Sequence, residues 1–347
     1  MLKINTNTTT DCLLSKIHFG VVVPQGSSYD FPLPDKDQQE KDEVDAINQY
    51  NYSKDIAESI DKYSLIDSIY TYDHFLPYYA PKNERNFFDC FILLSAIAAV
   101  TNRVKLGQVV TCSSFRNPAL LAKMLSTLDI ISEGRIELGI GAGWHKEEYR
   151  QYGYDFPPAP IRIEQLDESI TIIKSMWTEG RATFRGKHYS INDAICNPKP
   201  VQKPHPVIMV GGEGERYLLK VVAKHAGRYN HPCGSIQTLK RKLSIIKEYC
   251  ISIGRDHKDI EYSMLASCLV RETEEELRNV IRRRKTQPHG IQQVRAAEYT
   301  SLIGTPERIR TVINRYIDIG LTHFVLDLVG LDKDTIKIID SKIIKKL

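Results

Sequence analysis

The sequence predicts an α/β fold, a closed TIM (β/α)8 barrel with an insertion at its C-terminal face. The first observation is that apolar, β-rich runs alternate with amphipathic helical patterns along most of the 347 residues. Such alternation is typical of parallel strands joined by crossover helices. The second is that about eight such units can be counted, which favours a closed barrel over an open doubly wound sheet. We expect one domain over residues 1–347.

Eight runs carry the strand pattern, with β-branched and aromatic residues between turn signals. They lie at Ile17–Val23, near Leu65, at Val104–Val110, Arg135–Ile140 and Pro206–Val210, from Gly227, near Tyr262 and at His323–Val329. The run "GRYNH" from Gly227 has the weakest apolar signal of the set.

Helices are expected between these runs, and three of them carry clear boundary residues. Asn117 is a plausible N-cap, with Pro118 at the first helical position, where proline fits best. Thr305 and Pro306 repeat this arrangement further along the chain. Gly180 follows another amphipathic segment and is a natural helix stop.

Two segments interrupt the alternation and are expected to be surface excursions. Residues 24–51 are polar and mixed in charge. Residues 181–206 contain prolines that exclude a helix, and "ATFRGKHYSI" within them predicts a hairpin. Long insertions at one face of a barrel are usually functional or cover a site.

Composition excludes several classes of protein. An apolar fraction of 42% and a formal charge of +4 are ordinary for a soluble globular chain and give no reason to expect nucleic acid. The seven cysteines are scattered without a Cys-x-x-Cys pair, as in a reducing compartment. The longest apolar run, from Cys90, is too short to span a bilayer, and the N-terminus lacks the features of a signal peptide. We expect a cytoplasmic protein without a membrane partner.

Glycines gather at the ends of two predicted strands, where ligands bind in parallel barrels. "RIELGIGAGWHKEEY" places Gly139, Gly141 and Gly143 at one end, and Gly211 with Gly212 closes another strand before a helical segment. Glycine lets a ligand approach the backbone, and a helix N-terminus favours an anion such as a phosphate. The structural alternative is close packing or a bulge.

His74, in "TYDHF", directly follows the second predicted strand and is the candidate acid–base residue. Its unperturbed pKa near neutrality suits proton transfer. The alternative is a histidine satisfied by a structural neighbour. No His-Glu-x-x-His motif or other ligand spacing predicts a metal site, so we expect none.

Taken together, these stretches resemble the bacterial luciferase-like superfamily of flavin- and deazaflavin-dependent oxidoreductases. The resemblance runs in the family's order through "FGVVVPQG", "YTYDHF", "LDIISEGRIELGIGAGW" and "NPKPVQKPHPVIMVGG". It implies a TIM barrel with a ring cofactor across its C-terminal mouth. It also implies a non-proline cis peptide at the end of the third strand, which by position is Val109–Val110.

The resemblance also implies which residues contact the cofactor. Val109, Val110 and Thr111 would lie under the ring, while Gly141, Ala142 and Gly143 pass close to it. Trp144 would border the ring, and Gly211 with Gly212 would hold the phosphate. Glu147 and Glu148 are expected to begin the following helix, where acids favour the helix dipole.

The stretches "GAGWHKEEY" and "NPKPVQKPHPV" resemble the subgroup of this family that uses the deazaflavin coenzyme F420. This resemblance implies hydride transfer to or from a small organic substrate. His74 matches the histidine that takes part in proton removal in sugar-phosphate-oxidising relatives. Gln25 stands where those enzymes carry an acid on the first strand, and we place it with His74 in the catalytic set. Trp144 replaces a glutamate, so the full acid–base set of those relatives is not matched.

Two other functions stay open. The chain could be an FMN-dependent monooxygenase that uses reduced FMN and oxygen and depends on a separate flavin reductase. It could also be a barrel that binds flavin without turnover. In each case the family implies a homodimer.

Overall fold

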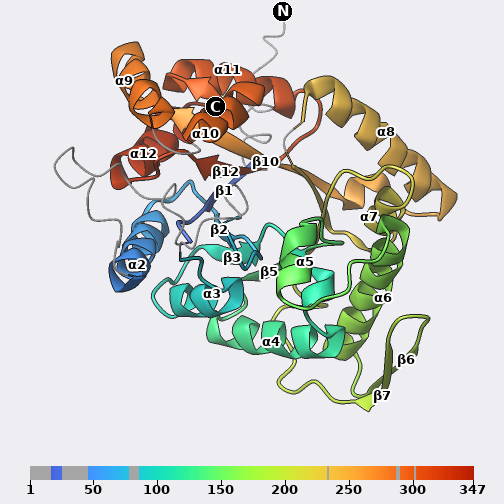
Figure 1. Cartoon of the computed structure of the whole chain (residues 1–347). Helices are drawn as coiled ribbons and strands as arrows, with labels where there is room; N and C mark the ends of the chain where they lie inside the picture. Colours follow the sequence, from blue (N-terminus) through green and yellow to red (C-terminus); the bar gives the residue numbers. More distant parts are fainter. Residues whose placement is uncertain (1–16, 26–45, 78–85, 233, 287–289, 301) are drawn as a thin grey trace, which may run out of the picture.

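The structure is a computed structural model that describes residues 17–25, 46–77, 86–232, 234–286, 290–300 and 302–347. Within them, a sheet of parallel strands closes into a barrel surrounded by helices (Figure 1). The strand order β1-β2-β3-β5-β8-β9-β10-β12 returns to β1 through the pairing of β12 with β1. The predicted barrel is confirmed, and the open doubly wound sheet is wrong.

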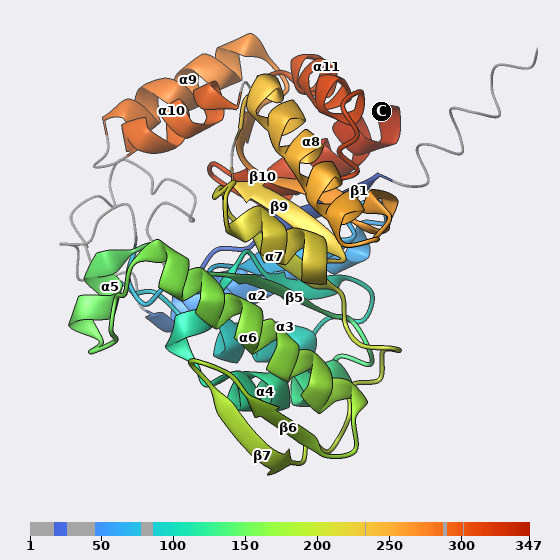
Figure 2. The same ribbon diagram turned by 90° about the vertical axis from the view of Figure 1, so that its right-hand side faces the viewer.

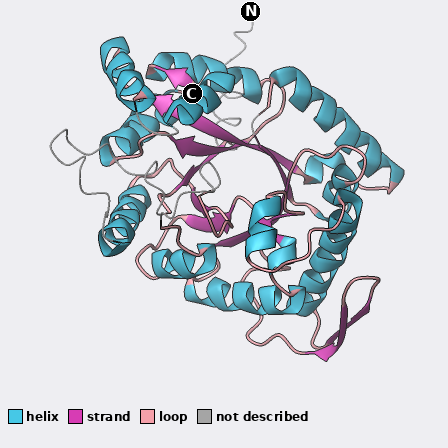
Figure 3. Cartoon of the chain, in the orientation of Figure 1, coloured by secondary structure: helices cyan, strands magenta, loops and turns pink. Residues whose placement is uncertain are grey.

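All eight predicted strands are present, and Figure 3 shows them enclosing the barrel interior. Their bounds are β1 (His18–Val22), β2 (Ser68–Thr71), β3 (Lys105–Gln108), β5 (Ile136–Gly141), β8 (Ile208–Gly211), β9 (Arg228–Pro232), β10 (Glu261–Val270) and β12 (His323–Leu328). The third strand is interrupted, because two residues separate β3 from the short β4 (Thr111–Cys112), which pairs with β5. A further short strand, β11 (Ile303–Gly304), pairs in parallel with the last two residues of β10.

The helices pack on the outside of the sheet. They are α2 (Ala46–Lys62), α3 (Cys90–Ala98), α4 (Pro118–Ile131), α6 (Ala159–Thr178), α7 (Leu218–His225), α8 (Ile236–Ser252), α9 (Glu274–Lys285), α10 (Gly290–Tyr299), α11 (Pro306–Ile317) and α12 (Lys333–Ile338). Asn117 Oδ1 accepts a hydrogen bond of 2.9 Å from the Ala119 amide, which confirms the predicted cap of α4. Among the described residues, no helix combines the length and apolar character needed to cross a membrane.

The structure differs from the prediction for the first expected excursion and agrees with the predicted hairpin in the second. Residues 26–45 lie outside the described part of the chain, and residues 46–51 belong to α2 rather than to a surface loop. Within 181–206, β6 (Ala182–Arg185) and β7 (Ser190–Ala194) form the predicted hairpin.

This hairpin does not cover the barrel mouth. A segment between a helix and the next strand starts at the opposite end of a barrel from the mouth, and the hairpin lies against the outside of α6 (Figure 2). Glu168 in α6 holds its turn, accepting hydrogen bonds of 2.7 to 2.9 Å from the amides of residues 187–189. The excursion at 181–206 is therefore not an insertion at the C-terminal face.

Side chains that point into the barrel form layers, because alternate residues of each strand face inward. The lowest layer is polar: Glu137 accepts a hydrogen bond of 2.7 Å from the Tyr70 hydroxyl and one of 2.6 Å from Arg228. The layer above is apolar and includes Val109, Met209 and Val325. The top layer opens to solvent at the carboxyl ends of the strands, where a site can form.

Candidate active site

A cavity of ≈ 670 Å³ opens at the carboxyl ends of the barrel strands. This volume lies in the range of about 300–1,000 Å³ that is typical of small-molecule sites. The residues predicted to contact a cofactor all line it: Val109, Val110, Thr111, Gly141, Ala142, Gly143, Trp144, Gly211 and Gly212. His74 lines it as well, at the end of β2.

One side of the cavity is formed by backbone and small residues at the ends of β3, β5 and β8. We call Val109–Thr111, Gly141–Gly143 and Gly211–Gly212 the glycine wall. The peptide bond between Val109 and Val110 is cis, as the family resemblance implied. It lies between β3 and β4 and interrupts the third strand.

The glycines are needed around Val110 before any ligand is considered. A Cβ atom added at Gly211 would lie 2.7 Å from Val110 Cγ1, and one at Gly141 would lie 2.9 Å from Val110 Cγ2. Gly143 and Gly212 have φ of +74° and +140°, which L side chains rarely adopt. Close packing and room for a ligand are therefore two consequences of the same residues.

The sequence suggested that Gly211 and Gly212 lead straight into a helix, but the structure differs. α7 begins only at Leu218, six residues after Gly212, and a turn fills the interval. Gly214 and Leu218 nevertheless line the cavity. An anion at Gly211 and Gly212 would therefore meet the amides of a glycine-containing turn rather than those of a regular helix.

His74 is held by a buried carboxylate. Its Nδ1 lies 2.7 Å from Glu148 Oε2, and the other carboxylate oxygen of Glu148 accepts hydrogen bonds from the amides of Phe75 and Leu76 at 2.8 and 3.1 Å. Glu148 has no exposed surface. Burial raises its pKa, but the hydrogen bond and charge of His74, with the two amides, lower it below its usual value. Nε2 of His74 lies on the opposite side of the ring from this carboxylate.

Glu148 comes from α5 (Lys146–Gln151), the short helix that follows Gly143. Glu147 and Glu148 occupy its first turn, as predicted, but their surroundings differ. Glu147 is partly exposed and pairs with Arg150 at 2.5 Å, whereas Glu148 is buried and contacts His74. The role of Glu148 was not predicted, although its position three residues after His145 is visible in the sequence.

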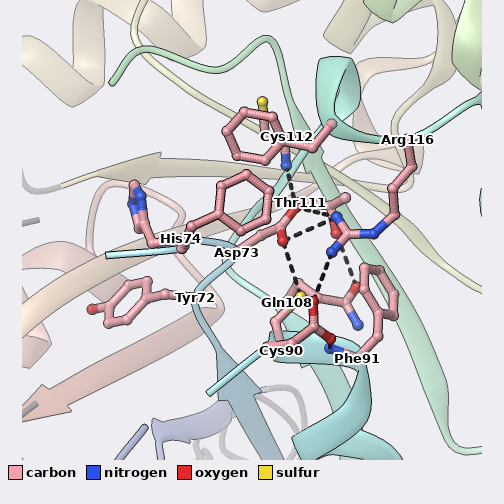
Figure 4. A network of polar contacts seen from close by, with 12 residues as sticks. Tyr72, Asp73, His74, Cys90, Phe91, Gln108, Thr111, Cys112 and Arg116 are labelled. Carbon is pink, nitrogen blue, oxygen red and sulfur yellow. Dashed lines mark hydrogen bonds and ion pairs between the residues drawn. The ribbon is translucent and has the colours of Figure 1, made fainter. Parts of the chain in front are cut away.

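Asp73 fixes the segment that carries His74 (Figure 4). It accepts hydrogen bonds from the Cys112 amide at 2.9 Å and from Arg116 Nη1 at 2.7 Å. The Cys90 thiol donates to its other oxygen at 3.1 Å. Desolvation lowers the pKa of Arg116, but the charge and hydrogen bond of Asp73, together with the neighbouring Cys90 and Asp89, raise it above its usual value. Asp73 therefore joins the ends of β2 and β4 to the start of α3 and leaves His74 to face the cavity.

Gln25 does not line the cavity. Its side-chain amide donates to the carbonyls of Tyr72 and Phe88 at 2.7 and 2.8 Å, and its oxygen accepts from the Tyr72 amide at 2.8 Å. It is 1% exposed. Gln25 thus ties the end of β1 to the backbone beside His74, which is the geometry of a positioning residue.

Trp144 and His145 border the mouth. Trp144 is 62% exposed, and its indole ring meets the His74 ring edge-on, with centroids 5.8 Å apart. His145 Nδ1 lies 3.3 Å from Glu148 Oε2. No metal site was expected, yet His74, His145 and Glu148 place one potential ligand atom each within 4.8 Å of one another. This is a geometry that could accept a divalent cation.

A second carboxylate that was not predicted is Asp327, across the mouth from the glycine wall. It lies near the end of β12 and lines the cavity. Burial raises its pKa to about 6, against hydrogen bonds from Tyr72 and Ser267 that lower it. Its signal in the sequence was an acid at an inward-facing position of an otherwise apolar strand.

These features define a class of protein: a parallel barrel enzyme with a glycine-walled mouth and a carboxylate-supported histidine beside it. The profile of the luciferase-like monooxygenase family matches residues 31–323. The chain belongs to this family, and the resemblance stated from its motifs is confirmed.

Curated relatives include two types of enzyme. The chain is 27% identical over 295 residues to the F420-dependent glucose-6-phosphate dehydrogenase of Amycolatopsis mediterranei, covering 78% of this chain and 86% of that protein. It is 30% identical over 186 residues to the FMNH2-dependent dimethylsulfone monooxygenase of Pseudomonas putida, covering 54% of this chain and 50% of that one.

Among solved structures, an F420-dependent secondary alcohol dehydrogenase in complex with an F420-acetone adduct superimposes with a TM-score of 0.75 at 19% identity. The match covers 94% of this chain and 98% of that chain. At this identity the likeness supports the fold alone.

Proposed function

We propose that the protein is an oxidoreductase that transfers a hydride between the deazaflavin coenzyme F420 and a small organic substrate. The observation that carries this proposal is His74, fixed by buried Glu148 at the edge of a glycine-walled cavity. The F420-dependent dehydrogenase that matches over most of both chains supports the deazaflavin.

The residues present fit such a cofactor. The glycine wall exposes backbone to the cavity, and Gly211 with Gly212 would hold the phosphate. Arg162, at the start of α6, lines the same cavity and is 8% exposed, and its Nε atom has no hydrogen-bond partner among the described residues. A buried guanidinium with an unused donor suits an anionic group.

When bound, a deazaflavin supplies a two-electron hydride acceptor or donor. We infer that His74 Nε2 accepts the proton that leaves a substrate hydroxyl during oxidation. In the reverse direction it donates that proton back during reduction. Glu148 keeps the Nδ1 side of the ring occupied and stabilises the imidazolium that forms. Gln25 and Asp73 hold the backbone that precedes His74, and Glu148 holds the amides that follow it.

FMN is the second candidate, because the dimethylsulfone monooxygenase also matches this chain. That chemistry needs reduced FMN, oxygen and a flavin reductase as partner. The cavity residues that would hold a phosphate are common to both cofactors, so geometry alone does not separate them.

Calorimetric titration of cofactor-free protein with oxidised F420 and with FMN, side by side, tests the proposal. We expect F420 to bind in the micromolar range or tighter, and more tightly than FMN. Preference for FMN would replace the proposal with the monooxygenase. Binding of either cofactor without turnover on any alcohol, carbonyl or oxygen-dependent substrate would favour a non-catalytic barrel.

A further inference from the structure

The mouth has a second polar group that the proposed chemistry does not use. Along β12, His323 and Val325 face the barrel interior, in the lowest and middle layers. Two residues further on, the same alternation turns Asp327 inward at the top layer. Its carboxylate therefore faces the cavity at the level where a substrate would lie.

Two hydroxyl side chains support this carboxylate. Ser267 is the direct neighbour of Asp327 in the parallel register of β10 and β12, and it also lines the cavity. Tyr72, at the end of β2, hydrogen-bonds to Asp327 as Ser267 does. We call Tyr72, Ser267 and Asp327 the polar wall. They come from β2, β10 and β12, whereas the glycine wall comes from the ends of β3, β5 and β8.

The two walls therefore face each other across the barrel, with His74 between them at the end of β2. A flat cofactor against the glycine wall would leave the space beside the polar wall for substrate. In that space the described cavity residues include the carboxylate of Asp327 but no lysine or arginine. Arg162 is the only lysine or arginine among the described residues that line the cavity, and it belongs to α6, which follows β5 of the glycine wall.

We propose that Asp327, held by Ser267 and Tyr72, is a substrate subsite that binds a hydroxyl group of an uncharged alcohol and excludes phosphorylated substrates. A carboxylate accepts a hydrogen bond from a hydroxyl group. The same carboxylate repels a phosphate, and the described part of the mouth offers no cation there to offset the charge. This inference rests on the proposed hydride transfer but names a selectivity that differs from that of a sugar-phosphate dehydrogenase.

The test uses matched probes that differ by one phosphate: glycerol with glycerol 3-phosphate, and glucose with glucose 6-phosphate, with 2-propanol as a minimal alcohol. Each is titrated calorimetrically into F420-loaded wild-type protein, Asp327→Ala and Asp327→Asn. We expect an uncharged probe to bind at least tenfold more tightly than its phosphorylated partner. Asp327→Ala should weaken that binding about tenfold, as loss of a hydrogen bond to a charged group does. Asp327→Asn should reduce the difference in affinity between an uncharged probe and its phosphorylated partner.

Asp318→Asn is the matched control, since it makes the same chemical change at an exposed carboxylate after α11, away from the mouth. It should leave every probe affinity unchanged. The inference is overturned if the phosphorylated partner binds as tightly as the uncharged probe, or if no uncharged probe binds protein that holds its cofactor. Failure of F420 to bind would instead refute the proposed function, and the same probe pairs titrated into cofactor-free protein would still decide the selectivity.

Discussion

The two walls of the mouth differ in what they present to the cavity: one presents mainly backbone, and the other presents polar side chains. The glycine wall presents backbone and the cis peptide at Val109–Val110, and a side chain at Gly141 or Gly211 would collide with Val110. The polar wall and His74 present side chains, each held by hydrogen bonds from a neighbouring strand or helix. Backbone built into a tight packing arrangement tolerates little change, whereas side chains at strand ends can be exchanged. The comparison suggests that the glycine wall serves a shared cofactor and the opposite side serves the particular substrate.

The largest effect should come from removing the imidazole between the walls. We expect His74→Ala to lower turnover by roughly 10²-fold or more, as for a lost acid–base group, while F420 affinity stays within a few-fold. Turnover measured by deazaflavin absorbance, with binding measured by calorimetry, separates the two quantities. His257→Ala, far from the cavity residues, is the control. Wild-type turnover in His74→Ala would remove the histidine from the mechanism.

Gly211→Val should distort the glycine wall and weaken cofactor binding, while the side chains of the polar wall stay in place. An added Cβ meets Val110 at 2.7 Å, so Val110 must move toward the cofactor space. Overpacking of this kind costs about 1–3 kcal/mol, and a loss of that size in binding free energy corresponds to roughly 5- to 150-fold weaker cofactor binding. Gly180→Val is the control, because a Cβ there meets nothing within 4 Å. Unchanged F420 affinity in Gly211→Val would place the phosphate elsewhere.

The variant Glu148→Gln tests whether the charge of Glu148 supports proton transfer by His74. The amide can replace the shape of the carboxylate but not its charge, so the imidazolium loses stabilisation. We expect turnover to fall about tenfold, the equivalent of roughly 1.5 kcal/mol for a charge-assisted hydrogen bond. The adjacent Glu147→Gln changes a partly exposed acid in the same helical turn and should have no effect on turnover. Equal behaviour of the two variants would contradict the positioning role of Glu148.

The smallest effect concerns the polar wall and stability. The pKa of Asp327 is raised to about 6 in the folded protein, so the folded state keeps a proton that the unfolded state loses near pH 4. Stability should therefore fall as pH rises from about 4 to 6 and then level off. The Asp327→Asn variant has no titrating group at this position, so it should not lose stability in this way as pH rises. We expect its unfolding free energy, relative to wild type, to rise by roughly 1 kcal/mol across that range, discounted for solvent access. A pH-independent difference in urea denaturation would show that Asp327 has an ordinary pKa.

Much of the barrel was predictable because periodicity and boundary residues are local. Asn117 with Pro118 placed a helix start to the residue, and even the weak run from Gly227 proved to be β9. The cis bond at Val109–Val110 came from family resemblance rather than from physical reasoning, since nothing in two valines predicts it. Local signals failed where the answer depended on packing. The prolines of 181–206 excluded a helix but did not reveal that Glu168 holds the hairpin against α6.

The site was only partly predictable for the same reason. His74 was visible because it follows a strand directly. Glu148 looked like any acid in a first helical turn, and only folding brings it 2.7 Å from His74 across 74 residues. Gln25 matched by position, but its polar atoms bond to backbone of Tyr72 and Phe88 instead of facing the cavity. Which side of a residue is buried, and against what, is set by tertiary contacts that no short motif contains.

The placement of the two tryptophans gives the protein a pair of independent optical reporters. Trp177 is 2% exposed, and its indole N–H donates to the Ala122 carbonyl at 3.0 Å, so its emission should be blue-shifted until the helices α4 and α6 separate. Trp144 stands in solvent at the rim, so its emission should be red-shifted and should be quenched when the mouth fills. The Trp144→Phe variant would then report unfolding alone, and the Trp177→Phe variant would report occupancy alone.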